Sequence, residues 1–181
     1  MKGSDMGNER GRPNMSELRL AAATRADVPA ILEMIHGLAQ FERLEHLCVA
    51  REDDVNRALF GDDAVVEVVL AWEGDKTAGF ALFFHNFSTF LGRRGLYLED
   101  LFVRPAFRRR GYGRALLVHL ARLAVERGCG RFEWTVLDWN APAIDFYRQL
   151  GAQVLPEWRI TRVTGAALAA LAAQPLLSTR R

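Results

Sequence analysis

The sequence predicts an α/β domain built on a mixed β-sheet. Short apolar runs follow one another in the middle of the chain, at 64–72, 77–85 and 96–103. Strands that are consecutive in sequence favour antiparallel pairing. A helical pattern at 111–127 then separates the last of these runs from another at 132–137. A strand–helix–strand crossover within one sheet is typical of parallel pairing, so we expect both kinds of pairing.

The N-terminal part of the chain predicts one strand and two helices before that sheet. Apolar and polar side chains alternate over Glu17–Ala23, which indicates a short strand. A helix is predicted over 28–40, because Asp27 is suited to cap it and Pro29 is tolerated in a first turn. A second, shorter helix is expected at Glu52–Phe60.

The C-terminal part continues the alternation of helix and strand. Asn140 is a suitable cap for a helix that runs to Leu150, and a last strand is expected around Trp158–Val163. A weak, alanine-rich helix follows near the C-terminus. We therefore expect a leader at 1–16 without regular structure, one domain at 17–173 and a short tail at 174–181.

Composition narrows the class of protein. With 181 residues, half of them hydrophobic, the chain can bury one sizeable core, and its net charge of +2 does not predict a general binder of polyanions. The two cysteines favour a reducing compartment, and the four histidines lack the spacing of metal ligands. No apolar run has the length of a membrane span. We expect a cytoplasmic protein without a metal or a membrane partner.

The stretch 96–127 carries the residues that point to chemistry. Glu99 and Asp100 interrupt an apolar strand, and burying a carboxylate costs several kcal/mol unless it is paired or used. By strand alternation Glu99 shares a face with Tyr97, Leu101 and Val103, whereas Asp100 points the other way. The alternative is that Glu99 has only a structural role, as a carboxylate paired with an arginine.

An arginine-rich turn with two glycines, Arg108–Gly113, joins this strand to the next helix. Glycines allow a ligand close to the backbone, and the free N–H groups of a helix start attract anions, so the turn indicates a phosphate site. The pattern R-x-x-G-x-G is short, and a solvated basic turn is the alternative without function. A nucleic-acid patch is less well supported, because no run of aromatic residues accompanies the arginines.

These residues resemble the acetyl-coenzyme A signature of the GNAT superfamily of N-acetyltransferases, [RQ]-x-x-G-x-[GA] between a strand and a helix. The resemblance covers about residues 17–163 and is closest to the spermidine/spermine acetyltransferase group, particularly its thialysine-type members. The most specific stretches are YLEDLFV, VLDWN and FYRQLGA. The resemblance implies a mostly antiparallel sheet, splayed at an acetyl-CoA cleft and flanked by helices.

The resemblance also implies a donor site and two catalytic groups. Glu99 corresponds to the group that removes the amine proton, and Tyr147 to the acid that protonates the thiolate of CoA; alone, a tyrosine on an amphipathic helix is more often a core residue. Acetyl-CoA would be bound by the strand after Asp100, the arginine–glycine turn and the helix after VLDWN. The cofactor-binding positions so implied are Leu101, Phe102, Val103, Arg108, Arg109, Arg110, Gly111, Tyr112, Gly113, Arg114, Asn140 and Ala143.

The acceptor implied by the resemblance is a small cationic amine. Phe41, Thr89 and Leu91 stand where polyamine-acetylating relatives carry tyrosine, aspartate and tryptophan, which favours a lysine-like amine over a long polyamine. The segment with Phe41, Glu42 and Glu45 would follow the first helix. The predicted substrate-binding residues are Phe41, Glu42, Glu99, Asp100, Glu133, Trp134, Thr135 and Glu157.

The predicted protein is a homodimer that transfers acetyl directly within a ternary complex. Two alternatives stay open on the same fold. One is acetylation of a protein lysine or N-terminus, and the other is a sensor that binds acetyl-CoA without turnover.

Overall fold

The computed structural model describes residues 18–176, so the expected leader at 1–16 and residues 177–181 of the expected tail lie outside the described residues. The chain divides into two compact units, Met1–Thr135 and Val136–Arg181, and each is described by itself. The first unit contains the sheet and the second contains the last two helices.

The first unit is built on a five-stranded mixed sheet in the order β1-β2-β3-β4-β5. The first four strands pair antiparallel with their neighbours, and β5 pairs parallel with β4, so the predicted mixed sheet is confirmed. The strands are β1 (Leu18–Ala22), β2 (Glu67–Glu73), β3 (Lys76–Ser88), β4 (Arg93–Val103) and β5 (Phe132–Trp134).

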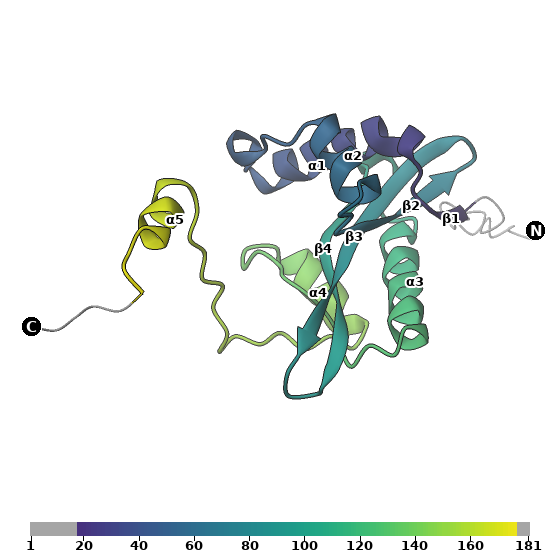
Figure 1. Ribbon diagram of the computed structural model, residues 1–181. Coiled ribbons are helices and arrows are strands. Elements are labelled where there is room, and N and C mark those ends of the chain that lie inside the picture. The colour runs from purple at the N-terminus through teal and green to yellow at the C-terminus, as the bar shows by residue number, and fades with distance from the viewer. Residues whose placement is uncertain (1–17, 177–181) are drawn as a thin grey trace, which may run out of the picture. The chain divides into compact units, whose positions relative to one another are not determined.

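Helices cover both faces of this sheet (Figure 1): α1 and α2 lie on one face, and α3 lies on the other. The helices of the first unit are α1 (Val28–Glu42), α2 (Glu52–Phe60) and α3 (Tyr112–Glu126). Because both faces are covered, the central strands are apolar on both sides, which explains why β2 contains the uninterrupted buried run Val68–Ala71.

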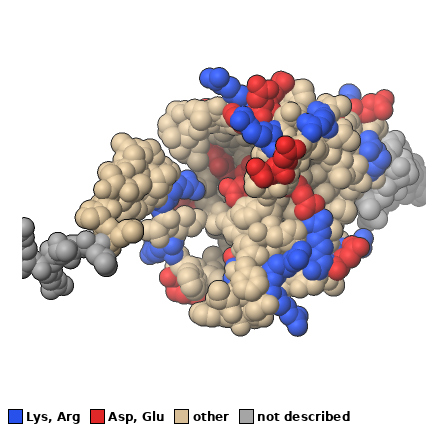
Figure 2. Space-filling model, in the orientation of Figure 1, with Lys and Arg blue, Asp and Glu red and all other residues tan. Residues whose placement is uncertain are grey.

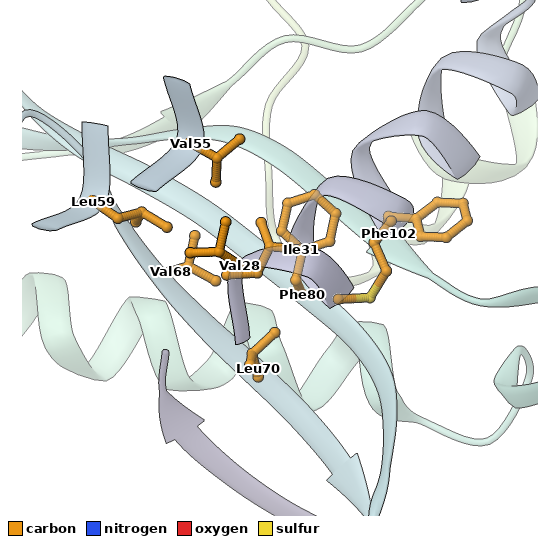
Figure 3. Close-up of a cluster of buried hydrophobic side chains, with 9 residues drawn as sticks. Val28, Ile31, Val55, Leu59, Val68, Leu70, Phe80 and Phe102 are labelled. Carbon is orange, nitrogen blue, oxygen red and sulfur yellow. The ribbon is translucent and has the colours of Figure 1, made fainter. Parts of the chain in front are cut away.

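The core on the α1 side is a continuous cluster of aliphatic and aromatic side chains (Figure 3). Phe80 on β3 and Phe102 on β4 lie opposite each other and meet α1. Gly37 allows this approach, because a Cβ there would lie 2.9 Å from the Phe102 ring. The cluster consists of Val28, Ile31, Met34, Val55, Leu59, Val68, Leu70, Phe80 and Phe102.

The first helix is longer than the sequence predicted. It begins after Asp27, whose carboxylate accepts hydrogen bonds from the Thr24 backbone N–H and hydroxyl, both at 2.7 Å. It ends only at Arg43, which adopts a left-handed conformation with φ 62°. Phe41 and Glu42 therefore belong to the last turn of α1, and the expectation that they follow the helix is wrong.

The second unit contains α4 (Ala141–Gln149) and α5 (Gly165–Ala172), close to the predicted helices. The strand expected at Trp158–Val163 is absent, because this segment is irregular and no described strand pairs with it; a strand requires a partner for its backbone groups. The strand predicted at 132–137 is also shorter than expected, since β5 ends at Trp134.

Candidate active site

A β-bulge in β4 determines how its two carboxylates are presented. Leu98 pairs with Phe83 and Asp100 pairs with Leu82, so Glu99 is an extra residue without a partner on β3. Bulges of this kind occur frequently beside active sites, where they redirect a side chain. Glu99 is exposed in this bulge.

The bulge reverses the alternation of β4. Residues paired directly across two strands share a face, and the neighbours Leu82 and Phe83 lie on opposite faces. Leu98 and Asp100 therefore lie on opposite faces, although they are two residues apart. Tyr97, which pairs with Phe84, shares the face of Asp100, while Leu101 lies on the other. The prediction that Tyr97 and Leu101 share one face with Glu99 is wrong, because it assumed a regular strand.

Asp100 is thereby placed on the α1 side of the sheet, where it interacts with another acid. Its pKa is raised to about 6 by burial, then by the negative charges of Glu99 and Glu42. Burial also raises the pKa of Glu42, in the last turn of α1. A cation bound beside Asp100 and Glu42 would favour their ionised forms and would itself be attracted by their negative charge. This group, Glu42, Glu99 and Asp100, is called the acidic group below.

The pairing between β4 and β5 ends beside the bulge. It extends over Leu96–Leu98 on β4 and stops at Trp134 on β5, so beyond Leu98 no described strand covers this edge of β4. The exposed Thr135 follows directly after β5. Two predicted substrate residues lie within β5 itself: Glu133 is ion-paired with Arg131, and the Trp134 ring packs on Phe132 at 4.9 Å between centroids.

The loop after β4 has the conformation of an anion site. Gly111, the residue before α3, has φ 85°, a value that favours glycine, and Arg109 has φ 61°. The loop leads into the fifteen-residue helix α3, whose first N–H groups lack helical partners. Gly113 and Arg114 lie in the first turn of α3. The predicted strand–turn–helix context of the glycine pattern is confirmed.

The arginines of this loop differ in their contacts. Arg108 is held by the protein: its Nε donates to the Val103 carbonyl at 3.0 Å, and its guanidinium carbon lies 4.8 Å from the centre of the Phe41 ring and 5.5 Å from that of Phe102. Arg110 is ion-paired with Glu73. Arg109 and Arg114 are exposed and, unlike Arg108 and Arg110, bond to no carbonyl or carboxylate of the described residues, so they are the arginines best placed for a ligand.

Glu73 is a residue of this site that sequence reasoning missed. It is the last residue of β2, and its carboxylate also accepts a hydrogen bond from the Tyr112 hydroxyl. The Tyr112 hydrogen bond, and then Arg110, lower the pKa of Glu73. In the sequence Glu73 lies in the hairpin stretch EGDK, where a charged residue is typical of a solvated turn, so no signal distinguished it.

In the second unit, the predicted residues lie on or near α4. The Asn140 side chain caps the helix by accepting a hydrogen bond from the Ala143 backbone N–H at 3.3 Å, as expected for an N-cap. Tyr147 lies in the last turn of α4, partly buried, with the centre of its ring 5.5 Å from that of Phe146. Glu157 is exposed in the irregular segment before Trp158.

Acidic and basic side chains are interspersed over the face seen in Figure 2 and do not form one basic surface. Among the described residues, no three His, Cys, Asp or Glu side chains are arranged so that they could hold one metal ion. None of the helices in the described part of the chain combines the length and the hydrophobicity of a membrane span.

Comparison with known proteins agrees with this fold and loop. The profile of the acetyltransferase (GNAT) family matches residues 32–152. An L-ornithine N5-acetyltransferase of Arabidopsis thaliana is 39% identical, over 89% of this chain and 90% of the relative. A thialysine N-epsilon-acetyltransferase of Mus musculus is 35% identical, over 87% of this chain and 99% of its own.

Solved structures show the same architecture. An integron cassette protein of V. cholerae superposes with a TM-score of 0.74 at 28% identity, covering 87% of this chain and 99% of that one. An aminoglycoside acetyltransferase from a soil metagenome gives 0.70 at 16% identity, over 83% and 97% of the two chains, which shows the fold alone.

The fold, the glycine loop and these similarities define an acyltransferase. The chain belongs to the acetyltransferase (GNAT) family.

The acidic group predicts an unusual pH dependence of stability. Because the pKa of Asp100 in the folded protein, about 6, lies above its ordinary 3.8, the folded state binds the proton more tightly than the unfolded chain. Asp100 therefore makes the free energy of unfolding fall as pH rises from about 4 to about 6, and the loss persists above that range. Asp100→Asn removes this pH-dependent loss. The free energy of unfolding of the variant, relative to that of the wild type, should therefore rise by about 1–3 kcal/mol from pH 4 to pH 7.

Urea unfolding of the variant and the wild type, each at pH 4 and at pH 7, checks this prediction. A stability difference between variant and wild type that is equal at pH 4 and pH 7 contradicts it. Glu42→Gln provides the matched second variant: it removes one of the charges that raise the pKa of Asp100, so the pH range of the loss should move downward.

Proposed function

We propose that this enzyme transfers the acetyl group of acetyl-CoA to the primary amine of a small cationic metabolite, of the ornithine, lysine or thialysine type or a diamine. The observation that carries the proposal is the near full-length similarity to two relatives named for acetylating ornithine and thialysine. Both of those substrates are amino acids with an amine at the far end of the side chain. The acidic group supports a cationic acceptor independently of the names.

The donor site in this proposal lies along β4 and the loop after it. The pyrophosphate of acetyl-CoA would bind the first N–H groups of α3 and the exposed arginines Arg109 and Arg114, since helix starts and guanidinium groups both favour phosphate. Pantetheine would pair with the free edge of β4 at Leu101–Val103. The carbonyl of Val103 already accepts from Arg108, so the remaining backbone groups of this edge are the ones available.

The acceptor site is proposed around the acidic group and Phe41. An amine with two cationic centres can place one near Glu42 and Asp100 and present the other to the thioester. Partial burial strengthens such an interaction, because screening by water is reduced there. Phe41, Glu133, Trp134 and Thr135, all of the first unit, complete the proposed lining.

In the proposed reaction Glu99 accepts the proton of the ammonium group through a water molecule. The free amine then attacks the thioester carbonyl, and the carbon–sulfur bond breaks as the nitrogen loses its second proton to solvent. Tyr147 gives its hydroxyl proton to the departing thiolate and regains a proton from solvent, so that an amide and free CoA are formed. The exposure of Glu99 in the bulge supports access of water to this carboxylate. No covalent acetyl-enzyme is needed, because both substrates are bound together.

A screen of acceptor amines tests the proposed activity. Release of the CoA thiol is measured with ornithine, thialysine, lysine, diamines, spermidine, an aminoglycoside and a peptide with a free N-terminus. We expect the highest kcat/KM for the amino acids with a terminal amine. A preference for the peptide would instead identify a peptide acetyltransferase. Thiol release with none of the acceptors, although acetyl-CoA binds, would identify a sensor.

Two conservative substitutions test the catalytic assignments. Tyr147→Phe and Glu99→Gln should each lower kcat by about 10²-fold, the usual contribution of a positioned acid or base, and leave the KM for acetyl-CoA within about twofold. Glu99→Gln keeps the size of the side chain and removes only its basicity. An unchanged kcat in either variant removes that residue from the mechanism.

We also propose that residues 17–173 act as one domain of a cytoplasmic homodimer. Support for a partner surface comes from the irregular segment before α5, where Trp158 is 73% exposed and Ile160 70%. Burying such side chains is favourable by about 1.5–3 kcal/mol each. Light scattering in solution should give twice the mass of one 20.4 kDa chain. A mass of one chain would contradict the dimer.

A further inference from the structure

Glu73 connects the hairpin turn between β2 and β3 to the donor loop. Its carboxylate accepts the hydroxyl of Tyr112, the first residue of α3, and pairs with the guanidinium of Arg110. Tyr112 is 2% exposed, so its hydroxyl depends on a protein partner. The loop is therefore attached, at its end next to α3, to a strand that lies 39 residues earlier in the chain.

Two aromatic rings pack against this attachment. The Phe107 ring meets the Tyr112 ring edge-on, with centroids 6.0 Å apart and planes at 89°. The Arg110 guanidinium lies 5.7 Å from the centre of each of these two rings. Arg110 is thus surrounded by a carboxylate and two aromatic rings, all of which favour a cation at this place.

The loop needs such an attachment because two of its residues have positive φ angles, which are unfavourable for a residue with a side chain. Arg109 adopts φ 61°, which costs a residue with a side chain about 1–2 kcal/mol, and Gly111 adopts φ 85° two residues later. Contacts from outside the loop must stabilise these angles. Arg108 supplies one contact, at the β4 end, and Glu73 supplies the other at the α3 end.

We propose that Glu73 is a positioning residue for the donor: through Tyr112 and Arg110 it holds the loop 108–113 and the start of α3 in the conformation that binds the phosphates of acetyl-CoA. Arg110 in this assignment is a partner of Glu73 rather than a phosphate ligand. The proposal rests on the donor site described under the proposed function and adds a residue to it.

The opposite end of β2 provides a matched control. Glu67, the first residue of β2, pairs with Arg127, the C-cap residue of α3, at 2.5 and 2.7 Å. The two ends of one strand are thus fastened to the two ends of one helix by similar ion pairs. Only the Glu73 end adjoins the donor loop. Glu67→Gln therefore removes a comparable ion pair between β2 and α3 that does not involve the donor loop.

The test measures binding of CoA by isothermal titration calorimetry and thermal stability in the full-length protein. Glu73→Gln and Tyr112→Phe should each raise the Kd for CoA about tenfold. This is the expected effect when the loop conformation that binds phosphate falls to about a tenth of the population. Glu67→Gln should leave the Kd for CoA within about twofold despite a similar loss in Tm. In the double variant Glu73→Gln/Tyr112→Phe the two losses in CoA affinity should be less than additive, because both substitutions weaken the contact between these two side chains.

The rival assignment predicts the opposite sign. If Arg110 binds phosphate and Glu73 merely withholds it, Glu73→Gln frees Arg110 and tightens CoA binding. Tighter or unchanged binding in Glu73→Gln, or equal weakening in Glu67→Gln, overturns the positioning role. Absence of CoA binding by the wild type would instead overturn the donor site itself, so the two failures are distinguishable.

Discussion

The β-bulge at Glu99 is the constraint on which the arrangement of the site depends. Before it, Leu96 and Leu98 are buried among the residues of the α3 side; after it, Asp100 and Phe102 face α1. One unpaired residue therefore turns the second half of β4 over. Without the bulge Asp100 would face α3 and Phe102 would leave the α1 core. The same insertion leaves Glu99 exposed, at the point where the pairing with β5 has just ended.

The donor loop illustrates how a short motif is held by distant residues. Arg108 ties one end to β4 and, through the Phe41 ring, to the last turn of α1; Tyr112 and Arg110 tie the other end to β2. Contacts with β4, α1 and β2, which all precede the loop in sequence, thus hold its two ends. The arginines of this stretch have different contacts in the structure, since Arg108 and Arg110 bond to protein groups, whereas Arg109 and Arg114 are exposed without such bonds in the described part of the chain.

Sequence was a good guide wherever the signal was local. The bounds of α2, the loop before α3 and the capping by Asn140 all depend on residues close in the chain, and the structure agrees with them. The bulge was missed because it arises from the pairing of β3 with β4, and no residue type marks it. Glu73 was missed because its partner Tyr112 lies far along the chain. The strand at Trp158–Val163 was predicted from its apolar side chains, but a strand also needs a neighbour, which composition does not reveal.

The two proposed substrates have opposite charge, and the structure keeps the corresponding protein charges apart. Asp100 and Val103 are three residues apart on β4, about 10 Å at the rise of a strand, which is close to the distance over which salt screens a charge. The arginine nearest to that end, Arg108, is directed to the Val103 carbonyl and two aromatic rings. No ion pair between this arginine and the acidic group occurs among the described residues. Burial and the negative charges of Glu99 and Glu42 therefore raise the pKa of Asp100, and the proposed cationic acceptor would offset this effect on binding.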